Sequence, residues 1–495
     1  MAESKKTKPK TLSKSSLMKG FQCEKYLWLS INQPEAAADT DAATQMQFDE
    51  GNEVGELARK HAGVGVLIQA DYWDYKKAHD LTEKALADGE TLIFEASFLN
   101  NGIFARVDIL KKDKKGWHLI EVKKASEVKE QYYQDAAIQS IVIESTGLNL
   151  ASISIRHINT EVTYPDLKNI FGTVDITKEV RAMQASVNKN IKTLLKVALA
   201  TKLPEKEIGP YCSDPYGCPF KSTCWKNIPK KSIFALPGVR GKKVWELYNA
   251  GKIKITDLDP KDFKNNTKRA IEVTKSNKLF VDKSQIKSEL ATWKFPLYFF
   301  DFETINPAIP RYEGTHPYGK IPFQFSCYIL ESARSSKLKH FEYLHTEASD
   351  PRAGIIKAML DGLGAKGSIV SYNKVFEIGV IKKLAEQDKK NRKALLALVE
   401  RFVDPLPLFR SAVYHPEFYG SFSIKEVAPA LIGEKLNYKN LTIGDGSTTQ
   451  AFAELILRGK IDPKAKNQVV EDMLAYCRQD TMAMVELFRW LQHHS

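Results

Sequence analysis

The sequence has no long apolar run, and no stretch approaches the roughly 18 to 20 apolar residues that a membrane-spanning helix needs. Its first twenty residues, MAESKKTKPKTLSKSSLMKG, are polar and basic and lack the apolar core of a secretory signal. Internal repeats are missing, and so are low-complexity stretches after the lysine-rich start. We therefore expect a cytoplasmic protein without a membrane partner. With 43% hydrophobic residues in 495, the chain can bury cores for two or three domains.

Acidic residues are the scarcer charged class, because 73 Lys and Arg oppose 60 Asp and Glu, for a net charge of +13. The excess is not confined to the N-terminus, since residues 1–19 contain six Lys and one Glu. A basic surface favours a polyanion such as nucleic acid, whose counterions are released when its phosphates are neutralised. An ordinary solvated surface explains the same charge equally well.

Cysteine is also rare, with six in the chain, and in a reducing compartment these are unlikely to form a disulfide framework. Cys327 and Cys477 lie in apolar or helical contexts typical of buried thiols. The other four comprise an evenly spaced trio in PYCSDPYGCPFKSTCW and one residue in SLMKGFQCEKYLWLSI: Cys212, Cys218, Cys224 and Cys23.

Thiolate ligands select zinc or iron-sulfur clusters, and four cysteines are enough for either. Structural zinc prefers closely paired cysteines, whereas the five-residue gaps and the remote Cys23 favour a [4Fe-4S] cluster. Zinc remains the alternative at this site. Cys23 itself has a plainer interpretation as a buried structural thiol, because it shares a helical face with Tyr26 and Leu27.

The first block of the chain, residues 1–225, contains a candidate catalytic pattern. Apolar and polar positions alternate in the stretch TLIFEASFLNNGIFARVDILKKDKKGWHLIEVKKA, with breaks at LNNG and KKDKKG, and this pattern predicts three antiparallel strands. The following QYYQDAAIQSIVIESTG predicts a helix. Asp108 closes one strand, and Glu121 and Lys123 leave one face of the next. Such carboxylates suit Mg²⁺ or Mn²⁺ in phosphodiester hydrolysis, with the lysine beside the water. An exposed strand with alternating charges is the plainer alternative.

The motif VDILKKDKKGWHLIEVKKA resembles the PD-(D/E)XK nucleases, and the four cysteines resemble their iron-sulfur subgroup, which includes AddB-type helicase-nucleases of the RecB family and CRISPR adaptation nucleases. The resemblance implies that Asp108, Glu121 and the carbonyl of Val122 hold the metal and that Lys123 lies beside the attacking water. Gln139 matches the family's glutamine that contacts the active centre. Where relatives carry a metal-binding His, this chain has Gly55, and the adjacent Glu56 is the candidate ligand.

The second block, residues 226–290, is predicted to be a basic, helical connector. Its SIFALPGVRGKKVWELYNAGKIKITDL resembles a helix-hairpin-helix element, whose turn can present N–H groups and lysines to a phosphate. A plain helical hairpin is the equal alternative.

The third block, residues 291–495, opens with the apolar strand PLYFFDFETINP, on which Asp301 and Glu303 share one face. Two adjacent carboxylates in an apolar setting repel each other unless cations are present. A later strand-loop-helix pattern places Glu377 near a helix start. In the terminal helix VEDMLAYCRQDTMAMVELFRWL, Tyr476 and Asp480 share a face.

The order D-x-E, N-x-x-F-E and Y-x-x-x-D resembles the DnaQ-like (DEDD) exonucleases, which have a ribonuclease H-like fold. The resemblance implies that four acids hold two divalent ions and that Tyr476 orients the water. The metal ligands would be Asp301, Glu303, Glu377 and Asp480. Glu377 stands where the family has Asp, and Asp404 in RFVDPLPLFR is expected to be structural.

Together the two halves resemble bacterial proteins grouped as the domain of unknown function 2779. The expected α/β architecture is a PD-(D/E)XK domain with an iron-sulfur cluster, a basic connector and a C-terminal ribonuclease H-like domain. We expect a metal-dependent exonuclease, acting on DNA rather than RNA, in repair or defence. The alternatives are an RNA-directed exonuclease and a nucleic-acid-binding scaffold with inactive centres.

Overall fold

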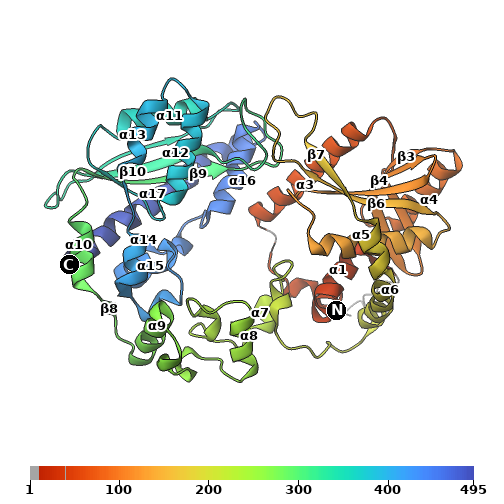
Figure 1. Cartoon of the computed structure of the whole chain (residues 1–495), viewed down its shortest axis with the longest axis horizontal. Coiled ribbons are helices and arrows are strands. Elements are labelled where there is room, and N and C mark those ends of the chain that lie inside the picture. Colours follow the sequence, from red (N-terminus) through yellow and green to blue (C-terminus); the bar gives the residue numbers. More distant parts are fainter. Residues whose placement is uncertain (1–10, 40) are drawn as a thin grey trace. The chain divides into compact units, whose positions relative to one another are not determined.

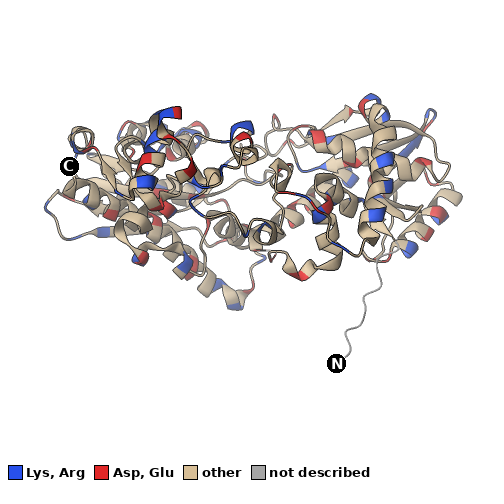
Figure 2. Ribbon diagram, turned by 90° about the horizontal axis from the view of Figure 1, so that it is seen from below, with Lys and Arg blue, Asp and Glu red and all other residues tan. Residues whose placement is uncertain are grey.

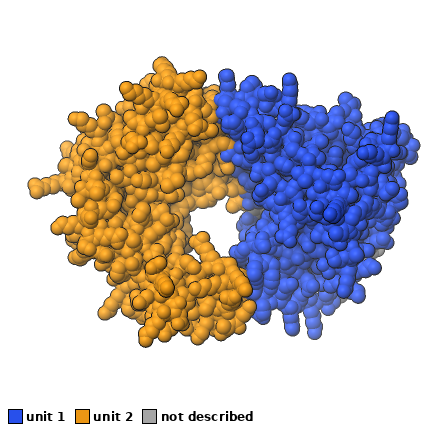
Figure 3. Space-filling view, in the orientation of Figure 1, with its two compact units in different colours: residues 1–40, 44–227, 307–318 blue, residues 41–43, 228–306, 319–495 orange. Residues whose placement is uncertain are grey.

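The computed structural model describes residues 11–39 and 41–495, and these fall into two compact units (Figures 1 and 3). Unit 1 contains residues 11–39, 44–227 and 307–318, and unit 2 contains residues 41–43, 228–306 and 319–495. The predicted first block thus corresponds closely to unit 1. The predicted connector and third block belong together in unit 2.

Unit 1 is built on one seven-stranded sheet with the order β2-β3-β4-β5-β6-β7, in which β1 also pairs with β4. The ladder is antiparallel from β3 to β5 and parallel between β5 and β6. Its strands are β1 (Leu12–Ser13), β2 (Val66–Leu67), β3 (Leu92–Asn100), β4 (Ile103–Asp113), β5 (Gly116–Lys123), β6 (Leu150–Ile158) and β7 (Phe171–Asp175). Its helices are α1 (Lys14–Gln22), α2 (Glu24–Asn32), α3 (Ala42–Ala62), α4 (Tyr75–Ala87), α5 (Glu130–Glu144), α6 (Thr177–Leu199) and α7 (Lys221–Cys224).

The three predicted strands and the predicted helix are confirmed as β3, β4, β5 and α5. Asn101 and Gly102, between β3 and β4, both have positive φ (49° and 74°). A tight hairpin turn requires this of both its central residues, and Asn and Gly adopt it most easily. Alternate side chains of β3 and β4 enter a core that is closed by α5 and α6, with Ala136 and Val180 fully buried.

Unit 2 contains a five-stranded sheet with the order β11-β10-β9-β12-β13. Strands β9, β10 and β11 are antiparallel, whereas β12 and β13 run parallel to β9. The strands of unit 2 are β8 (Phe280–Val281), β9 (Leu297–Ile305), β10 (Ile321–Leu330), β11 (Lys339–Leu344), β12 (Ser368–Val370), β13 (Phe402–Val403) and β14 (Val413–Tyr414). Its helices are α8 (Lys242–Asn249), α9 (Asn265–Ser276), α10 (Lys283–Leu290), α11 (Arg352–Gly362), α12 (Val375–Gln387), α13 (Arg392–Val399), α14 (Leu406–Ser411), α15 (Ile424–Ile432), α16 (Gly446–Leu457) and α17 (Pro463–His493).

The connector region does not form a separate block. Ile233, Val244 and Ile271 are buried in the same core as Phe409 of α14 and Leu487 of α17. This apolar contact explains why the region clusters with the C-terminal part of the chain, although its composition is basic. Of the two segments around the PGVRG turn, the first is a single 3₁₀ turn at Ile233–Ala235 and the second is α8.

Lysines, arginines and acids are interspersed along the helices of both units (Figure 2). The net positive charge alone therefore does not identify a binding face, and a binding site has to be argued from particular residues. None of the helices in the described part of the chain combines the length and the apolarity that crossing a membrane requires.

Candidate metal centres

Unit 2 brings three of the predicted acids into one small volume. Asp301 and Glu303 leave the same face of β9, and Asp480 reaches them from α17. Each of the three residues offers a carboxylate oxygen, and these oxygens all lie within 4.8 Å of one another. Asp480 is buried, and Asp301 and Glu303 are partly buried. This is the spacing at which carboxylates bind one or two divalent cations.

Burial and mutual repulsion dominate the electrostatics of this acid cluster. Burial raises the pKa of Asp301 well above its usual value, and the charges of Asp480 and Glu377 raise it further. Burial also raises the pKa of Glu303, with Asp480 as the next contributor. For Asp480 itself, burial raises the pKa to about 6. Such a cluster retains protons unless cations neutralise it.

Glu377 lies in the first turn of α12 and is almost fully buried. Burial raises its pKa to about 7. Among the described residues, its Oε2 atom has no hydrogen-bond partner. A buried carboxylate oxygen left without a donor is a fitting ligand for a cation, so the residue present agrees with the predicted metal site.

Asp404 has the structural role expected from the sequence. Its carboxylate accepts backbone N–H bonds from Asn373, Lys374 and Leu406, at 3.1, 3.2 and 2.8 Å. Two of these residues lie directly before α12, so Asp404 fixes the start of the helix that carries Glu377.

Tyr476 lies one helical turn before Asp480 on α17, as predicted, and is buried beside the acids. Two residues that the sequence analysis did not predict complete this site. The Tyr438 hydroxyl donates to Asp480 Oδ1 at 2.5 Å. Lys425 Nζ lies 5.2 Å from the centre of the Tyr438 ring and 4.9 Å from that of the Tyr476 ring, and its charge lowers the pKa of Glu303.

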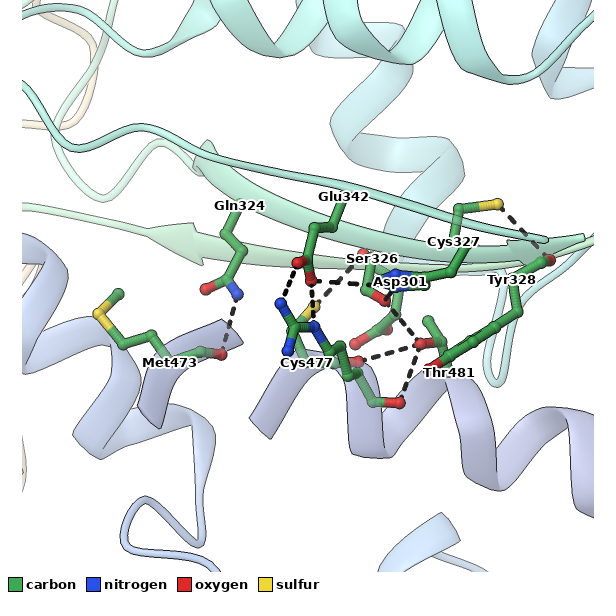
Figure 4. Close-up of polar contacts among 11 residues, drawn as sticks. Asp301, Gln324, Ser326, Cys327, Tyr328, Glu342, Met473, Cys477 and Thr481 are labelled. Atoms are coloured by element: carbon green, nitrogen blue, oxygen red, sulfur yellow. Dashed lines mark hydrogen bonds and ion pairs between the residues drawn. The ribbon is translucent and has the colours of Figure 1, made fainter. Parts of the chain in front are cut away.

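Helix α17 is fixed to the sheet by polar contacts on both sides of Asp480 (Figure 4). Gln324 of β10 donates to the Met473 carbonyl at 2.9 Å, and the Ser326 hydroxyl lies 2.8 Å from the Thr481 hydroxyl. Both contacts are buried, and a shift of α17 would break them at a cost in free energy. The distance between Asp480 and the acids of β9 is therefore held by the fold.

Unit 1 gathers a second set of charged groups where β4, β5 and α5 meet. Asp108 Oδ2 accepts a hydrogen bond from the Val122 backbone N–H at 2.6 Å, and Lys123 Nζ lies 2.7 Å from Glu121 Oε1. Burial, followed by the charge of Glu121, raises the pKa of Asp108 well above its usual value. The structure thus brings the three residues of the D-E-K pattern together.

Two further residues of this second centre come from α1 and α5. Lys14 Nζ lies 2.7 Å from Glu121 Oε1 and 2.9 Å from Asp135 Oδ1. The predicted Gln139 is buried and donates to Asp135 Oδ1 at 3.2 Å. Although burial opposes the effect, the charges of Lys123 and Lys14 hold the pKa of Asp135 far below its usual value. Two lysines thus neutralise much of this acid cluster.

Part of the second centre still has open acceptors. Among the described residues, Glu121 Oε2 and Gln139 Oε1 are buried without a hydrogen-bond partner. Both are oxygen atoms of the kind that hard cations prefer. The donor set therefore fits a Mg²⁺ or Mn²⁺ ion at Asp108 and Glu121.

Glu56 does not join this cluster. It is an exposed residue of α3 whose carboxylate lies 2.8 Å from Lys60 on the same helix. The acid that the structure does place beside Asp108 is Glu95, whose charge contributes to the raised pKa of Asp108. Glu95 has a φ of 57° at an irregularity between β3 and β4, opposite Asp108.

The four predicted cysteines gather at one end of unit 1. Burial raises the pKa of Cys218 to about 11, and the charges of Cys224, Cys212 and Cys23 add to this effect. The Cys218 backbone N–H also donates to the Cys212 carbonyl at 3.2 Å. Such electrostatic coupling requires that the thiols be near neighbours.

Comparison with protein families matches residues 298–423 to the domain of unknown function DUF2779. This range begins in β9 and ends before α15, and it covers about a quarter of the chain. The expected resemblance to that family is therefore confirmed for the segment that contains Asp301, Glu303 and Glu377.

The curated relatives include two uncharacterized proteins. UU173 of Ureaplasma parvum serovar 3 is 26% identical over 205 residues, which cover 38% of this chain and 30% of the relative. MG366 of Mycoplasma genitalium is 23% identical over 251 residues, which cover 47% of this chain and 38% of the relative. The chain thus spans well under half the length of these relatives.

A search of solved structures matches an alkaline exonuclease (LHK-Exo) from Laribacter hongkongensis. The sequences are 15% identical, and the match covers 39% of this chain and 89% of the exonuclease, with a TM-score of 0.24. A TM-score this low does not establish a common fold.

Proposed function

We propose that the protein is a metal-dependent nuclease, an exonuclease that acts on DNA. The observation that carries this proposal is the acid cluster of unit 2, where oxygens of Asp301, Glu303 and Asp480 lie within 4.8 Å of one another in a largely buried setting. The burial of three mutually repelling carboxylates is costly unless cations are bound. The order of these acids, with Glu377 in place of the family's Asp and with Tyr476, resembles that of the DnaQ-like exonucleases.

Mg²⁺ or Mn²⁺, when bound, lowers the pKa of a water ligand and polarises the scissile phosphoryl oxygen. The acids of β9 and α17 would hold the ions, and Tyr476 would orient the attacking water. In the hydrolysis, the water oxygen would bond to phosphorus, the bond from phosphorus to the leaving oxygen would break, and a proton of the water would pass through solvent to the leaving oxygen. Lys425 supplies a positive charge beside Tyr476 and Tyr438, where it can contact a substrate phosphate.

In unit 1, Asp108, Glu121 and Lys123 form a candidate second nuclease centre. One observation favours a different role for it: Lys14 and Lys123 already neutralise Glu121 and Asp135. A centre satisfied by its own lysines suits a nucleic-acid-binding scaffold as well as an enzyme. The two roles are separated by mutation.

The test is degradation of end-labelled single- and double-stranded DNA and RNA with Mg²⁺ or Mn²⁺. The variants are Lys123→Ala, Asp301→Ala and the double variant, with Glu471→Ala as a control that removes an exposed charge from α17. We expect Asp301→Ala to abolish cleavage. Loss in Lys123→Ala alone would assign the activity to unit 1, and a wild type that degrades no substrate would refute the enzyme.

We also propose that Cys23, Cys212, Cys218 and Cys224 bind a [4Fe-4S] cluster. The proposal is supported by the electrostatic coupling of the four thiols, which makes them near neighbours, and by thiolate being a ligand that iron-sulfur clusters select. Zinc is the alternative at this site.

An anaerobic preparation of the protein should be brown and absorb near roughly 400 nm, as thiolate-bound clusters do. Metal analysis that finds stoichiometric zinc and no iron would overturn the cluster.

A further inference from the structure

Unit 1 contains a pocket of about 490 Å³ that none of the motifs predicts. It lies between α3, the segment after β2, and the paired strands β3 and β4. Three cationic residues line it, Arg59, Lys77 and Arg106, together with the acids Asp71 and Glu95. A pocket of several hundred Å³ accommodates a small ligand or one nucleotide.

Arg106 provides the main evidence for an anionic ligand. Its Nε atom donates to the Ser97 hydroxyl at 3.2 Å, which orients the guanidinium group. Its Nη2 atom is buried and has no hydrogen-bond partner among the described residues. An unsatisfied buried donor on a charged group is rare in proteins, because its desolvation is not compensated. A phosphate oxygen in the pocket would accept this bond.

The pocket shares a wall with the acid centre of unit 1. Glu95 lines the pocket and lies at the irregularity of β3 that faces Asp108 of β4. Arg59 Nη1 lies 3.2 Å from Glu95 Oε1, so this ion pair holds the Arg59 guanidinium group at the wall of the pocket. A phosphate in the pocket would therefore be the neighbour, along the nucleic-acid strand, of the phosphate that reaches Asp108 and Glu121.

Two aromatic side chains follow the rim of the pocket directly. After Asp71, the chain continues into Tyr72 and Trp73, whose side chains are 76% and 63% exposed. Their ring centres are 4.9 Å apart at nearly perpendicular planes. Large aromatic residues this exposed gain nothing from the core, but an unpaired base can stack on them.

We infer that this pocket binds a phosphate of single-stranded nucleic acid, with an adjacent base stacked on Tyr72 or Trp73. The inference rests on the proposed nuclease function and extends it, because it names a substrate-holding site outside both acid centres. Arg106 and Arg59 contact the phosphate, and Lys77 contributes charge at the mouth. The strand then continues toward Asp108.

Binding is measured apart from cleavage, by fluorescence anisotropy in EDTA with 3′-labelled oligonucleotides of about 15 thymidines or uridines. Each is used with a 5′-phosphate and with a 5′-hydroxyl, so that a terminal phosphate is distinguished from an internal one. The variants are Arg106→Gln, Lys77→Gln, Trp73→Ala and Tyr72→Ala, and the control is Lys111→Gln, an exposed lysine of β4. Lys77 is exposed on α4, so its replacement keeps the test valid if Arg106→Gln folds poorly.

We expect Arg106→Gln to weaken binding at least about tenfold, since it removes a charge-assisted hydrogen bond. The slope of log K against log salt should fall in magnitude by about 0.7 for each lost phosphate contact. Trp73→Ala or Tyr72→Ala should weaken binding on the order of tenfold without changing that slope. Lys111→Gln should bind like the wild type.

Wild-type affinity and salt slope in both Arg106→Gln and Lys77→Gln would overturn the phosphate site. Wild-type affinity in both Trp73→Ala and Tyr72→Ala would overturn the stacking surface. If the wild type binds with these dependences but cleaves nothing, the pocket stands and the nuclease function fails. If the wild type cleaves nucleic acid but the pocket variants bind as tightly as the wild type, the nuclease function stands and the phosphate pocket fails.

Discussion

Replacement of Asp480 by Asn should make the metal-free protein more stable at alkaline pH. Burial raises the pKa of Asp480 to about 6 from the 3.8 of a free side chain. Because the folded-state pKa is the higher one, the folded state binds the proton more tightly than the unfolded state. Stability is therefore lost as the pH rises from about 4 to about 6, and the loss is complete above that range.

The size of this loss follows from the shift of about 2.2 units, at 1.36 kcal/mol each, and is about 3 kcal/mol for Asp480. The asparagine side chain in the Asp480→Asn variant would keep an oxygen for the Tyr438 hydroxyl but carry no charge. In EDTA at pH 8, the unfolding midpoint of unit 2 should therefore rise by roughly 6 to 12 °C. At pH 4 the gain should disappear.

Thermal unfolding of Asp480→Asn, the wild type and Glu471→Gln measures this effect, the last being a control that removes an exposed charge from the same helix. Addition of Mn²⁺ should reverse the order. At 1,000 times its Kd, the ion stabilises the wild type by about 4.1 kcal/mol, which exceeds the gain of about 3 kcal/mol in the variant, and the variant has lost a ligand. A variant no more stable than the wild type at pH 8, or equally stabilised at pH 4, would refute the reasoning.

Three other perturbations have defined outcomes. Lys14→Gln should lower the stability of unit 1 toward urea in EDTA by about 3 kcal/mol, since it leaves the two buried carboxylates of Glu121 and Asp135 with Lys123 as their shared cation; an unchanged unfolding midpoint would contradict the ion pair with Glu121. Cys23→Ser should remove the iron and lower the thermal midpoint of unit 1; full iron content by metal analysis would exclude Cys23 as a ligand. Tyr438→Phe removes the hydrogen bond that lowers the pKa of Asp480. In EDTA, the pH at which the loss of stability is complete should therefore rise by about 1 pH unit. Identical profiles of stability against pH in the variant and the wild type would show that this bond does not affect Asp480.

Local patterns predicted the elements of both centres well. The two-residue period of a strand placed Asp301 and Glu303 on one face, and the i, i+4 spacing of a helix placed Tyr476 and Asp480 on one face. Asp135 could have been found by the same rule, because it lies four residues before Gln139 on α5. These predictions succeed because the periods are set by backbone geometry.

The residues that were missed depend on long-range pairing. Lys14 reaches the acids because a two-residue strand, Leu12–Ser13, pairs in parallel with Ile103 and Phe104. Glu95 departs from simple alternation at a local irregularity of β3. Neither contact has a signature in the neighbouring sequence, and both are decided by tertiary structure.

The helix α1 links the two candidate metal sites of unit 1. Lys14 is its first residue, and Cys23 follows its last, so about 13 Å of continuous helix joins them. A shift of a rigid helix along its own axis moves both of its ends together. With the proposed cluster bound, an axial shift of Cys23 would therefore be transmitted to Lys14, whose ammonium pairs with Glu121 and Asp135, and the charge balance of the acid centre would respond to the state of a distant sulfur.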